Sequence, residues 1–164
     1  MRIRIHGRNR KVTRKEMRYA IKWMCQQLLP ELHEDLFVEL HMKRLQEDNA
    51  WMTPIDYTPN LRSFKVVIDT SNPRHRQLTY LAHEIVHIKQ YARGEMRDRF
   101  VQVRSPRGVK YQLKEVRFKT WIFNPVLVEY NKQPWEIEAR KLQGKLYKSY
   151  RDHLKTIDMD FVKA

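Results

Sequence analysis

Apolar residues recur at helical spacing near the start of the chain. In residues 12–29 they lie at Met17, Ala20, Ile21, Met24, Cys25 and Leu28, a period close to that of an α-helix. Thr13 and Glu16 stand three residues apart in a capping-box pattern, which predicts where this helix begins. Pro30 predicts where it ends, because proline lacks the backbone N–H that would continue the helical hydrogen bonds.

Two later segments also have helical character. Residues 71–94 read SNPRHRQLTYLAHEIVHIKQYARG, and here we expect Asn72 to cap the helix, Pro73 to be its first residue and Gly94 to end it. Residues 133–150, QPWEIEARKLQGKLYKSY, predict a last helix that begins at Pro134.

Alternation of apolar and polar residues predicts the strands. In residues 35–45, DLFVELHMKRL, every second position is apolar, which indicates a half-buried strand with His41 on its solvated side. Residues 61–70 predict a second strand, and residues 99–113 predict a hairpin that turns at residues 105–108. The order helix, two strands, helix, hairpin, helix is typical of an α+β domain.

The composition fits one folded unit. The chain has 164 residues, 41% of them hydrophobic, so we expect one domain over residues 1–164 with a basic N-terminal arm and a short C-terminal tail. Apolar runs are too short to cross a membrane. The basic N-terminal residues are not followed by the apolar stretch that a secretory signal requires. Cys25 is the single cysteine, which excludes an intrachain disulfide. These features predict a cytoplasmic protein with no membrane partner, and they leave the oligomeric state open.

The charge of the chain changes this picture. The formal net charge is +14 at pH 7, and such a surface attracts nucleic acids or acidic proteins. Polar positions of the predicted hairpin include Arg104, Lys110 and Lys114, so that one of its faces is expected to be basic. Nucleic acid is therefore one candidate partner.

The segment LAHEIVHIKQYARGE carries the strongest chemical signal. His83 and His87 are four residues apart, so on a helix both imidazoles lie on one face and can bind one metal ion. Glu84 is displaced around the helix and would lie beside the metal, where it can hold a water molecule. The pattern is short, and an exposed helix could carry it without any metal.

A catalytic zinc ion takes a third protein ligand and keeps one position open. The last predicted helix offers two glutamates, and Glu136 already has a structural explanation because a carboxylate near the helix start can cap it. Glu138 lies on a row that should pack inward, so we predict Glu138 as the third ligand and keep Glu136 as the alternative.

The paired segments LAHEIVHIKQYARGE and PWEIEAR resemble those of small single-domain zincin metallopeptidases of the gluzincin type, as found in phage genomes. The resemblance covers residues 64 to about 147, and His83, Glu84, His87 and Glu138 match its motif by position. It implies a small mixed sheet with an edge strand beside the motif helix, where an extended peptide can bind as a further strand. Residues 61–70 would be that neighbourhood. In a phage, the location would be the cytoplasm of the host cell.

We therefore predict a zinc-dependent metalloprotease, a hydrolase of peptide bonds with Zn²⁺ as cofactor and a protein or peptide as substrate. His83, His87 and Glu138 would bind the metal, and Glu84 would act as general base on the attacking water. Candidates for stabilising the transition state are Tyr91, Tyr130, Tyr147 and His153, of which we favour Tyr130 and His153. The alternative is a basic nucleic-acid-binding module whose zinc site is structural or vestigial.

Overall fold

The structure is a computed structural model, and it describes residues 1–56, 58–106 and 108–157. Its helices are α1 (Arg14–Leu28), α2 (Arg74–Ala92) and α3 (Pro134–Leu154), with short 3₁₀ turns η1 (His33–Asp35) and η2 (Tyr130–Lys132). Its strands are β1 (Arg2–His6), β2 (Phe37–Lys43), β3 (Ala50–Pro54), β4 (Ser63–Asp69), β5 (Met96–Ser105), β6 (Gly108–Phe118) and β7 (Trp121–Phe123). The predicted α+β class is confirmed.

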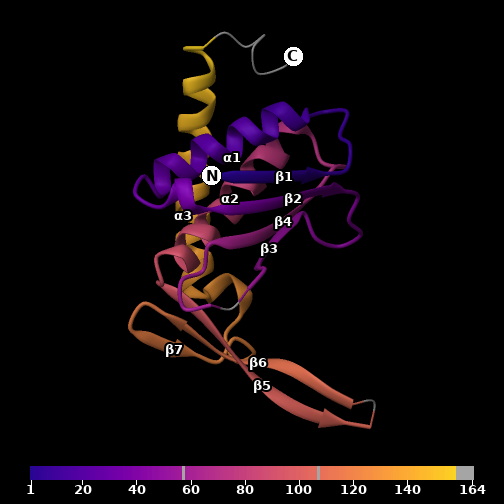
Figure 1. Cartoon of the computed structure of the whole chain (residues 1–164), viewed down its shortest axis with the longest axis vertical. Coiled ribbons are helices and arrows are strands. Elements are labelled where there is room, and N and C mark those ends of the chain that lie inside the picture. The colour runs from indigo at the N-terminus through magenta and orange to yellow at the C-terminus, as the bar shows by residue number, and fades with distance from the viewer. Residues whose placement is uncertain (57, 107, 158–164) are drawn as a thin grey trace.

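The larger sheet has four strands in the order β1-β2-β4-β3 (Figure 1). Strands β1, β2 and β4 run parallel, whereas β3 runs antiparallel to β4, so the sheet is mixed. Strand β3 pairs with β4 alone among the described residues, which leaves its other side as a sheet edge. This edge lies beside α2, which packs against both β3 and β4.

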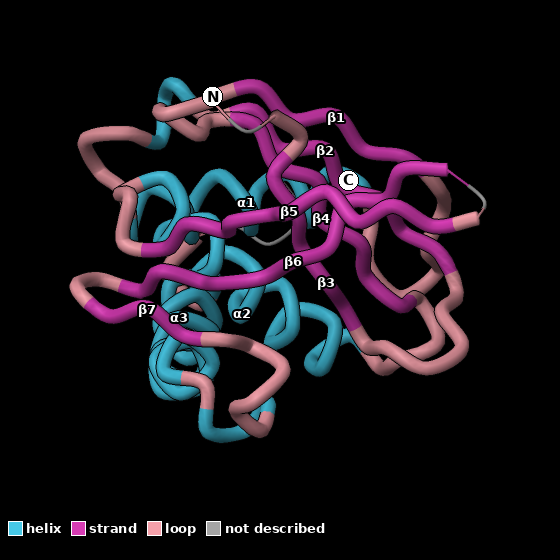
Figure 2. The backbone as a smooth tube through the Cα atoms, turned by 90° about the horizontal axis from the view of Figure 1, so that it is seen from below, coloured by secondary structure: helices cyan, strands magenta, loops and turns pink. Residues whose placement is uncertain are grey.

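All three helices lie on one side of this sheet (Figure 2). The alternation along β2 explains the arrangement, because Val38, Leu40 and Met42 are buried toward the helices while Glu39 and His41 face the other way. Helix α1 turns its apolar row into the same core, and Thr13 caps it as predicted by accepting a hydrogen bond from the backbone N–H of Glu16 over 3.0 Å.

The second sheet, β5-β6-β7, is antiparallel, and the β5–β6 ribbon extends away from the helices (Figure 1). The predicted hairpin is confirmed by the pairing of β5 with β6, although Arg107 in its turn lies outside the described residues. None of the described helices is both long enough and apolar enough to cross a membrane.

Three local predictions need correction. Arg2–His6 is not a basic arm but an edge strand that pairs with β2. Helix α1 forms the crossover connection between these two parallel strands. Residues 61–70 form β4, which lies inside the sheet, and the edge strand beside α2 is β3 instead. Helix α2 starts at Arg74 with Pro73 as its N-cap, because Asn72 uses its side-chain amide to bond Asn49 and Asp69. The last residues of the C-terminal tail lie outside the described chain.

Candidate metal centre

Helix α2 presents the two motif histidines to α3. Apolar residues on the other side of α2, among them Leu78, Leu81 and Ile85, are fully buried in the core and fix the rotation of the helix. His83 and His87 then lie one above the other, with side chains 13% and 10% exposed. The predicted placement of this pair on one face of a helix is confirmed.

A carboxylate of α3 meets both imidazoles. Nε2 of His83 lies 3.2 Å from Oε2 of Glu136, and Nε2 of His87 lies 3.2 Å from its Oε1. The two Nε2 atoms are 3.0 Å apart. Ligand atoms of a tetrahedral zinc ion are separated by about 3.4 Å, given Zn–N bonds of about 2.0–2.1 Å. The three side chains are therefore already spaced nearly as a zinc ion would require.

The hydrogen bonds around His87 determine which ring nitrogen is free. The Gln90 amide nitrogen donates to the carbonyl oxygen of Trp135 over 3.0 Å and to Oε2 of Glu138 over 2.8 Å. Oε1 of Gln90 must then be the atom that faces Nδ1 of His87 at 2.8 Å. Because that oxygen can only accept, His87 carries its proton on Nδ1, and in the neutral ring Nε2 is an unprotonated acceptor.

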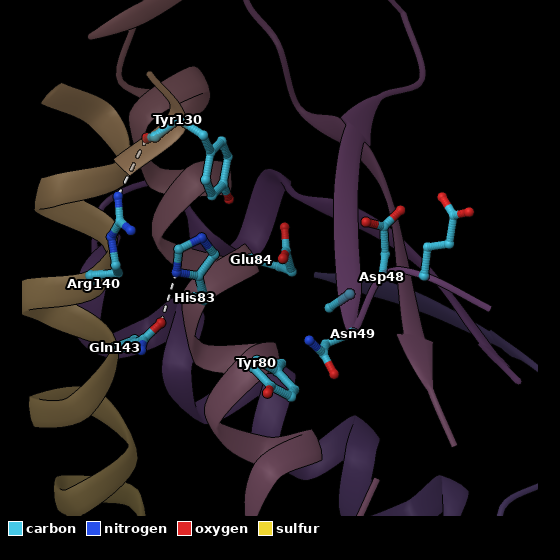
Figure 3. A pocket seen from close by; sticks show the side chains of 10 residues that line it. Asp48, Asn49, Tyr80, His83, Glu84, Tyr130, Arg140 and Gln143 are labelled. Carbon is cyan, nitrogen blue, oxygen red and sulfur yellow. Dashed lines mark hydrogen bonds between the residues drawn. The ribbon is translucent and has the colours of Figure 1, made fainter. Parts of the chain in front are cut away.

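His83 has a similar partner. Its Nδ1 lies 2.7 Å from Oε1 of Gln143 on α3, which directs its Nε2 toward Glu136 and His87 (Figure 3). Such contacts to the outer nitrogen orient and tune histidines that bind metals. Each imidazole is thus held at its Nδ1 atom by a glutamine, His83 by Gln143 and His87 by Gln90.

Electron-pair donors therefore converge on one point. The two Nε2 atoms and the carboxylate of Glu136 face each other, and Oε2 of Glu136 is buried without a hydrogen bond of good geometry. Lone pairs brought this close repel unless a proton or a metal cation lies between them, and a metal cation can satisfy all three side chains at once. Two histidines and one glutamate are a known zinc-binding set, so the side chains present fit this metal.

The pKa shifts agree with an anionic, cation-binding cluster. Burial opposes the ionisation of Glu136, but its interactions with His83 and then His87 outweigh burial and hold its pKa far below the usual range. Burial also lowers the pKa of His87, and here the nearby Glu136 and Glu84 reverse the effect and raise it. The cluster thus attracts positive charge.

Glu138 does not lie beside the histidines, and its predicted placement there is wrong. Residues 136 and 138 are about 200° apart around a helix, so only one of them can face α2 at this point. Glu138 instead accepts hydrogen bonds from Gln90 and, over 3.1 Å, from Nζ of Lys119. The prediction that Glu136 serves to cap the start of α3 is wrong, because its carboxylate turns inward to the imidazoles.

Glu84 borders a pocket of about 340 Å³ beside the histidines. The pocket is lined by Glu47, Asp48, Asn49, Ala50, Tyr80, His83, Glu84, Tyr130, Arg140 and Gln143. The Glu84 carboxylate lies between His83 and Asp48 (Figure 3), and within the described part of the chain it makes no hydrogen bond or ion pair. Burial raises the pKa of Glu84, although the nearby histidines oppose this rise. A buried acid that faces a pocket with no partner is free to act on a ligand.

A second, smaller pocket of about 170 Å³ continues along α2. It shares Ala50, His83, Glu84 and Tyr130 with the first pocket and adds Trp51, Met52, His87, Tyr91, Met96 and Glu136. The two pockets therefore meet at Glu84, and Ala50, the first residue of β3, lines both.

The two favoured candidates for transition-state stabilisation lie in different places. The Tyr130 side chain lies by His83 at the pocket (Figure 3), and burial, then contact with Glu136, raises the pKa of its hydroxyl. His153 lies at the far end of α3, where its Nε2 is 2.7 Å from the Tyr19 hydroxyl and its ring stacks on Trp23. His153 is thus a packing residue outside the pocket, and its prediction as part of the site is wrong.

Sequence reasoning missed Gln90, Gln143 and β3. Gln90 had a signal, since it lies three residues after His87 on the buried side of an amphipathic helix, where an amide needs polar partners. Gln143 could be placed only once α3 was known to pack against α2.

Neither a scan against protein-family models, nor a search of curated proteins, nor a search of solved structures found a match to this chain.

Proposed function

We propose that the protein is a zinc-dependent peptidase in which His83, His87 and Glu136 bind the metal. The observation that carries this proposal is the convergence of three electron-pair donors, of which His87 and Glu136 are buried and His83 is partly buried. Both imidazoles are held in place by glutamines. A zinc ion bound there supplies Lewis acidity, which polarises a peptide carbonyl and favours loss of a proton from water near neutral pH.

Side chains of the protein would transfer the proton and stabilise the transition state. Glu84, unpaired at the meeting point of the two pockets, accepts the proton of the attacking water and passes it to the leaving amine. Its raised pKa suits this role, because a general base that holds its proton more firmly also delivers it well near neutral pH. The Tyr130 hydroxyl borders both pockets and can donate a hydrogen bond to the oxyanion that forms.

An extended peptide fits beside β3. The outer side of this strand has no partner among the described residues. The smaller pocket is lined by residues 50–52 of β3, and the larger pocket meets the strand at Ala50 next to Glu84. Backbone N–H and C=O groups of β3 could pair with a substrate strand and align its scissile bond with Glu84. Protein or peptide is therefore the proposed substrate class, and the cytoplasm the proposed location.

The test of this function combines metal analysis with a cleavage assay. Zinc content is measured on wild type and on His83→Ala, and both are incubated with a proteome-derived peptide library whose new termini are sequenced. We expect one zinc per chain at this site and zinc-dependent cleavage, both lost in the variant. Cleavage that is unaffected by His83→Ala would contradict the proposal.

A second function has support from a different part of the molecule. The β5–β6 ribbon exposes Arg104, Lys110 and Lys114, and Tyr111 is 70% exposed. The register places Arg104 opposite Val109, on the face of Tyr111, whereas Lys110 points to the other face, so the basic residues are not confined to one face as predicted. Basic side chains and an exposed aromatic ring on one ribbon are typical of surfaces that bind single-stranded nucleic acid through phosphate contacts and base stacking. We therefore keep nucleic-acid binding as a companion activity of the ribbon, with the peptidase acting on proteins held there.

A further inference from the structure

A second cluster of metal-binding side chains lies on the face of the four-stranded sheet that the helices leave uncovered. His6 ends β1 and is the register partner of His41 on the parallel strand β2. Glu39 precedes His41 by two residues and so points to the same face. None of these residues takes part in the metal centre on α2.

Their donor atoms converge as closely as those on α2. Nε2 of His6 lies 2.8 Å from Oε1 of Glu39, and Nε2 of His41 lies 3.2 Å from the same oxygen. The two rings stack with their centroids 4.5 Å apart. Although the side chains of His6 and His41 are 43% and 28% exposed, both Nε2 atoms are buried and make no hydrogen bond of good geometry. Each ring thus turns its unsatisfied nitrogen inward to Glu39.

Ordinary ion pairing explains this arrangement poorly. Two neutral imidazoles could each donate an Nε2–H to Glu39, but neither Nε2 makes a hydrogen bond of good geometry with it. Protonation of both rings would stack two cations against each other. The basic neighbours of Glu39 do not pair with it either, since Arg4 lies over the ring of Phe37 and Lys65 over that of Trp51. Among the residues that the structure describes, His6 and His41 are the only ion-pair partners of Glu39.

The backbone holds His6 in this position. Gly7 directly follows it with φ +86°, and a Cβ there would lie 2.0 Å from the carbonyl oxygen of Met42. Only glycine allows so close an approach, and it brings the end of β1 against the segment that carries His41. The convergence of the two imidazoles is therefore built into the sheet.

We propose that His6, Glu39 and His41 form a second binding site for a divalent transition metal, with zinc as the best-matched ion. Two imidazole nitrogens and one carboxylate oxygen suit zinc or its first-row neighbours, whereas magnesium and calcium prefer oxygen ligands throughout. Among the described strands β1 pairs with β2 alone, and the metal links it to the centre of the sheet. The metal therefore acts as a staple for the N-terminal strand.

The first test is zinc stoichiometry by equilibrium dialysis of the full chain. Wild type should bind two equivalents, while His41→Ala and, separately, His83→Ala/His87→Ala should each bind one. Combining the three substitutions should leave none. The matched control is His75→Ala, which removes an exposed histidine outside both clusters and should retain two equivalents. One equivalent in wild type that persists in His41→Ala would overturn the proposal, as would the loss of an equivalent in His75→Ala.

A second measurement reads out the staple independently of the centre on α2. Hydrogen exchange of residues 2–6 is followed in His83→Ala/His87→Ala with and without zinc. Zinc at about ten times its dissociation constant should slow this exchange roughly tenfold if opening of β1 releases the metal. Glu39→Gln, which keeps the size of the side chain, should abolish the slowing. Exchange that zinc does not change would contradict the proposed site, whatever the fate of the peptidase proposal.

Discussion

His87 donates its Nδ1–H to the side-chain oxygen of Gln90 over 2.8 Å, and this contact leaves Nε2 as the nitrogen that can bind a metal. Gln90 is itself fixed, because its amide nitrogen donates to Trp135 and to Glu138. A chain of hydrogen bonds therefore runs from Glu138 through Gln90 to His87. It gives Glu138 a positioning role behind the metal centre in place of the ligand role that the sequence suggested.

Substitution of Gln90 tests this series of hydrogen bonds. Gln90→Leu removes the acceptor that selects the tautomer of His87, so zinc affinity at the α2 centre should fall by about 10- to 100-fold. The measurement is zinc titration against a competing chelator, with circular dichroism to verify folding because Gln90 is fully buried. Gln112→Leu on the exposed ribbon is the matched control and should bind as wild type. Equal affinity of Gln90→Leu and wild type would show that the contact does not position His87.

The two glutamates of α3 should separate clearly in the same assay. Glu136→Ala removes a proposed ligand and should abolish zinc binding at the α2 centre. Glu138→Ala removes an acceptor of Gln90 and should weaken binding by about 10- to 100-fold without abolishing it. If Glu138→Ala were the variant that lost the metal, the arrangement of α3 described above would be wrong.

Metal removal should lower thermal stability. His83 and His87 lie on α2 and Glu136 on α3, so an ion bound by all three links the two helices. Zinc at about 100 times its dissociation constant adds about 2.7 kcal/mol to the free energy of unfolding. For a chain of this size that corresponds to a rise in Tm of roughly 5–10 °C. Calorimetry with zinc and with a chelator tests this. His83→Ala/His87→Ala should lose most of the chelator response.

Nucleic-acid binding by the ribbon should depend on charge and on Tyr111. Lys110→Glu should reduce affinity for single-stranded DNA and flatten its dependence on salt by about one unit of logarithmic slope or more. Tyr111→Ala should weaken binding by about 1–3 kcal/mol if a base stacks on the ring. The charge-matched control Lys22→Glu, on exposed α1 surface, should have a smaller effect. Affinity by fluorescence anisotropy that is insensitive to salt would exclude phosphate contacts as its basis.

The fold was predictable where a segment carried its own periodicity. The α-helices, β2, β4 and the hairpin follow from apolar spacing, and Thr13 marked the start of α1 correctly. Strand β1 also alternates, with Ile3 and Ile5 packed against the core, but its arginines suggested a free basic arm. Strand β3 escaped prediction because its five residues show no alternation, and its pairing with β4 is a tertiary property.

The candidate site was predictable only in part, because some of its residues are brought together by tertiary packing and not by local spacing. The spacing of His83 and His87 fixes their common face within one helix, and no other element is needed to place them. The choice between Glu136 and Glu138 depends on how α3 is rotated against α2, which is set by Trp135 packing on Phe118 and Phe123. Likewise, His6 and His41 are far apart in sequence, and only the parallel pairing of β1 with β2 brings them together.

Glu84→Gln tests most directly whether Glu84 moves a proton for a hydrolytic reaction. Glutamine keeps the shape of the side chain but cannot accept the proton of the attacking water. Because Glu84 is not among the proposed ligands, zinc content and Tm should stay at wild-type values.

The decisive measurement is the rate at which wild type and Glu84→Gln, both loaded with zinc, cleave a peptide identified in the library assay. The rate should fall by at least about 10²-fold, the lower end of what a general base contributes. Asp48→Asn, which changes another acid lining the same pocket, is the control and should retain far more activity. Cleavage by Glu84→Gln at the wild-type rate would contradict the account.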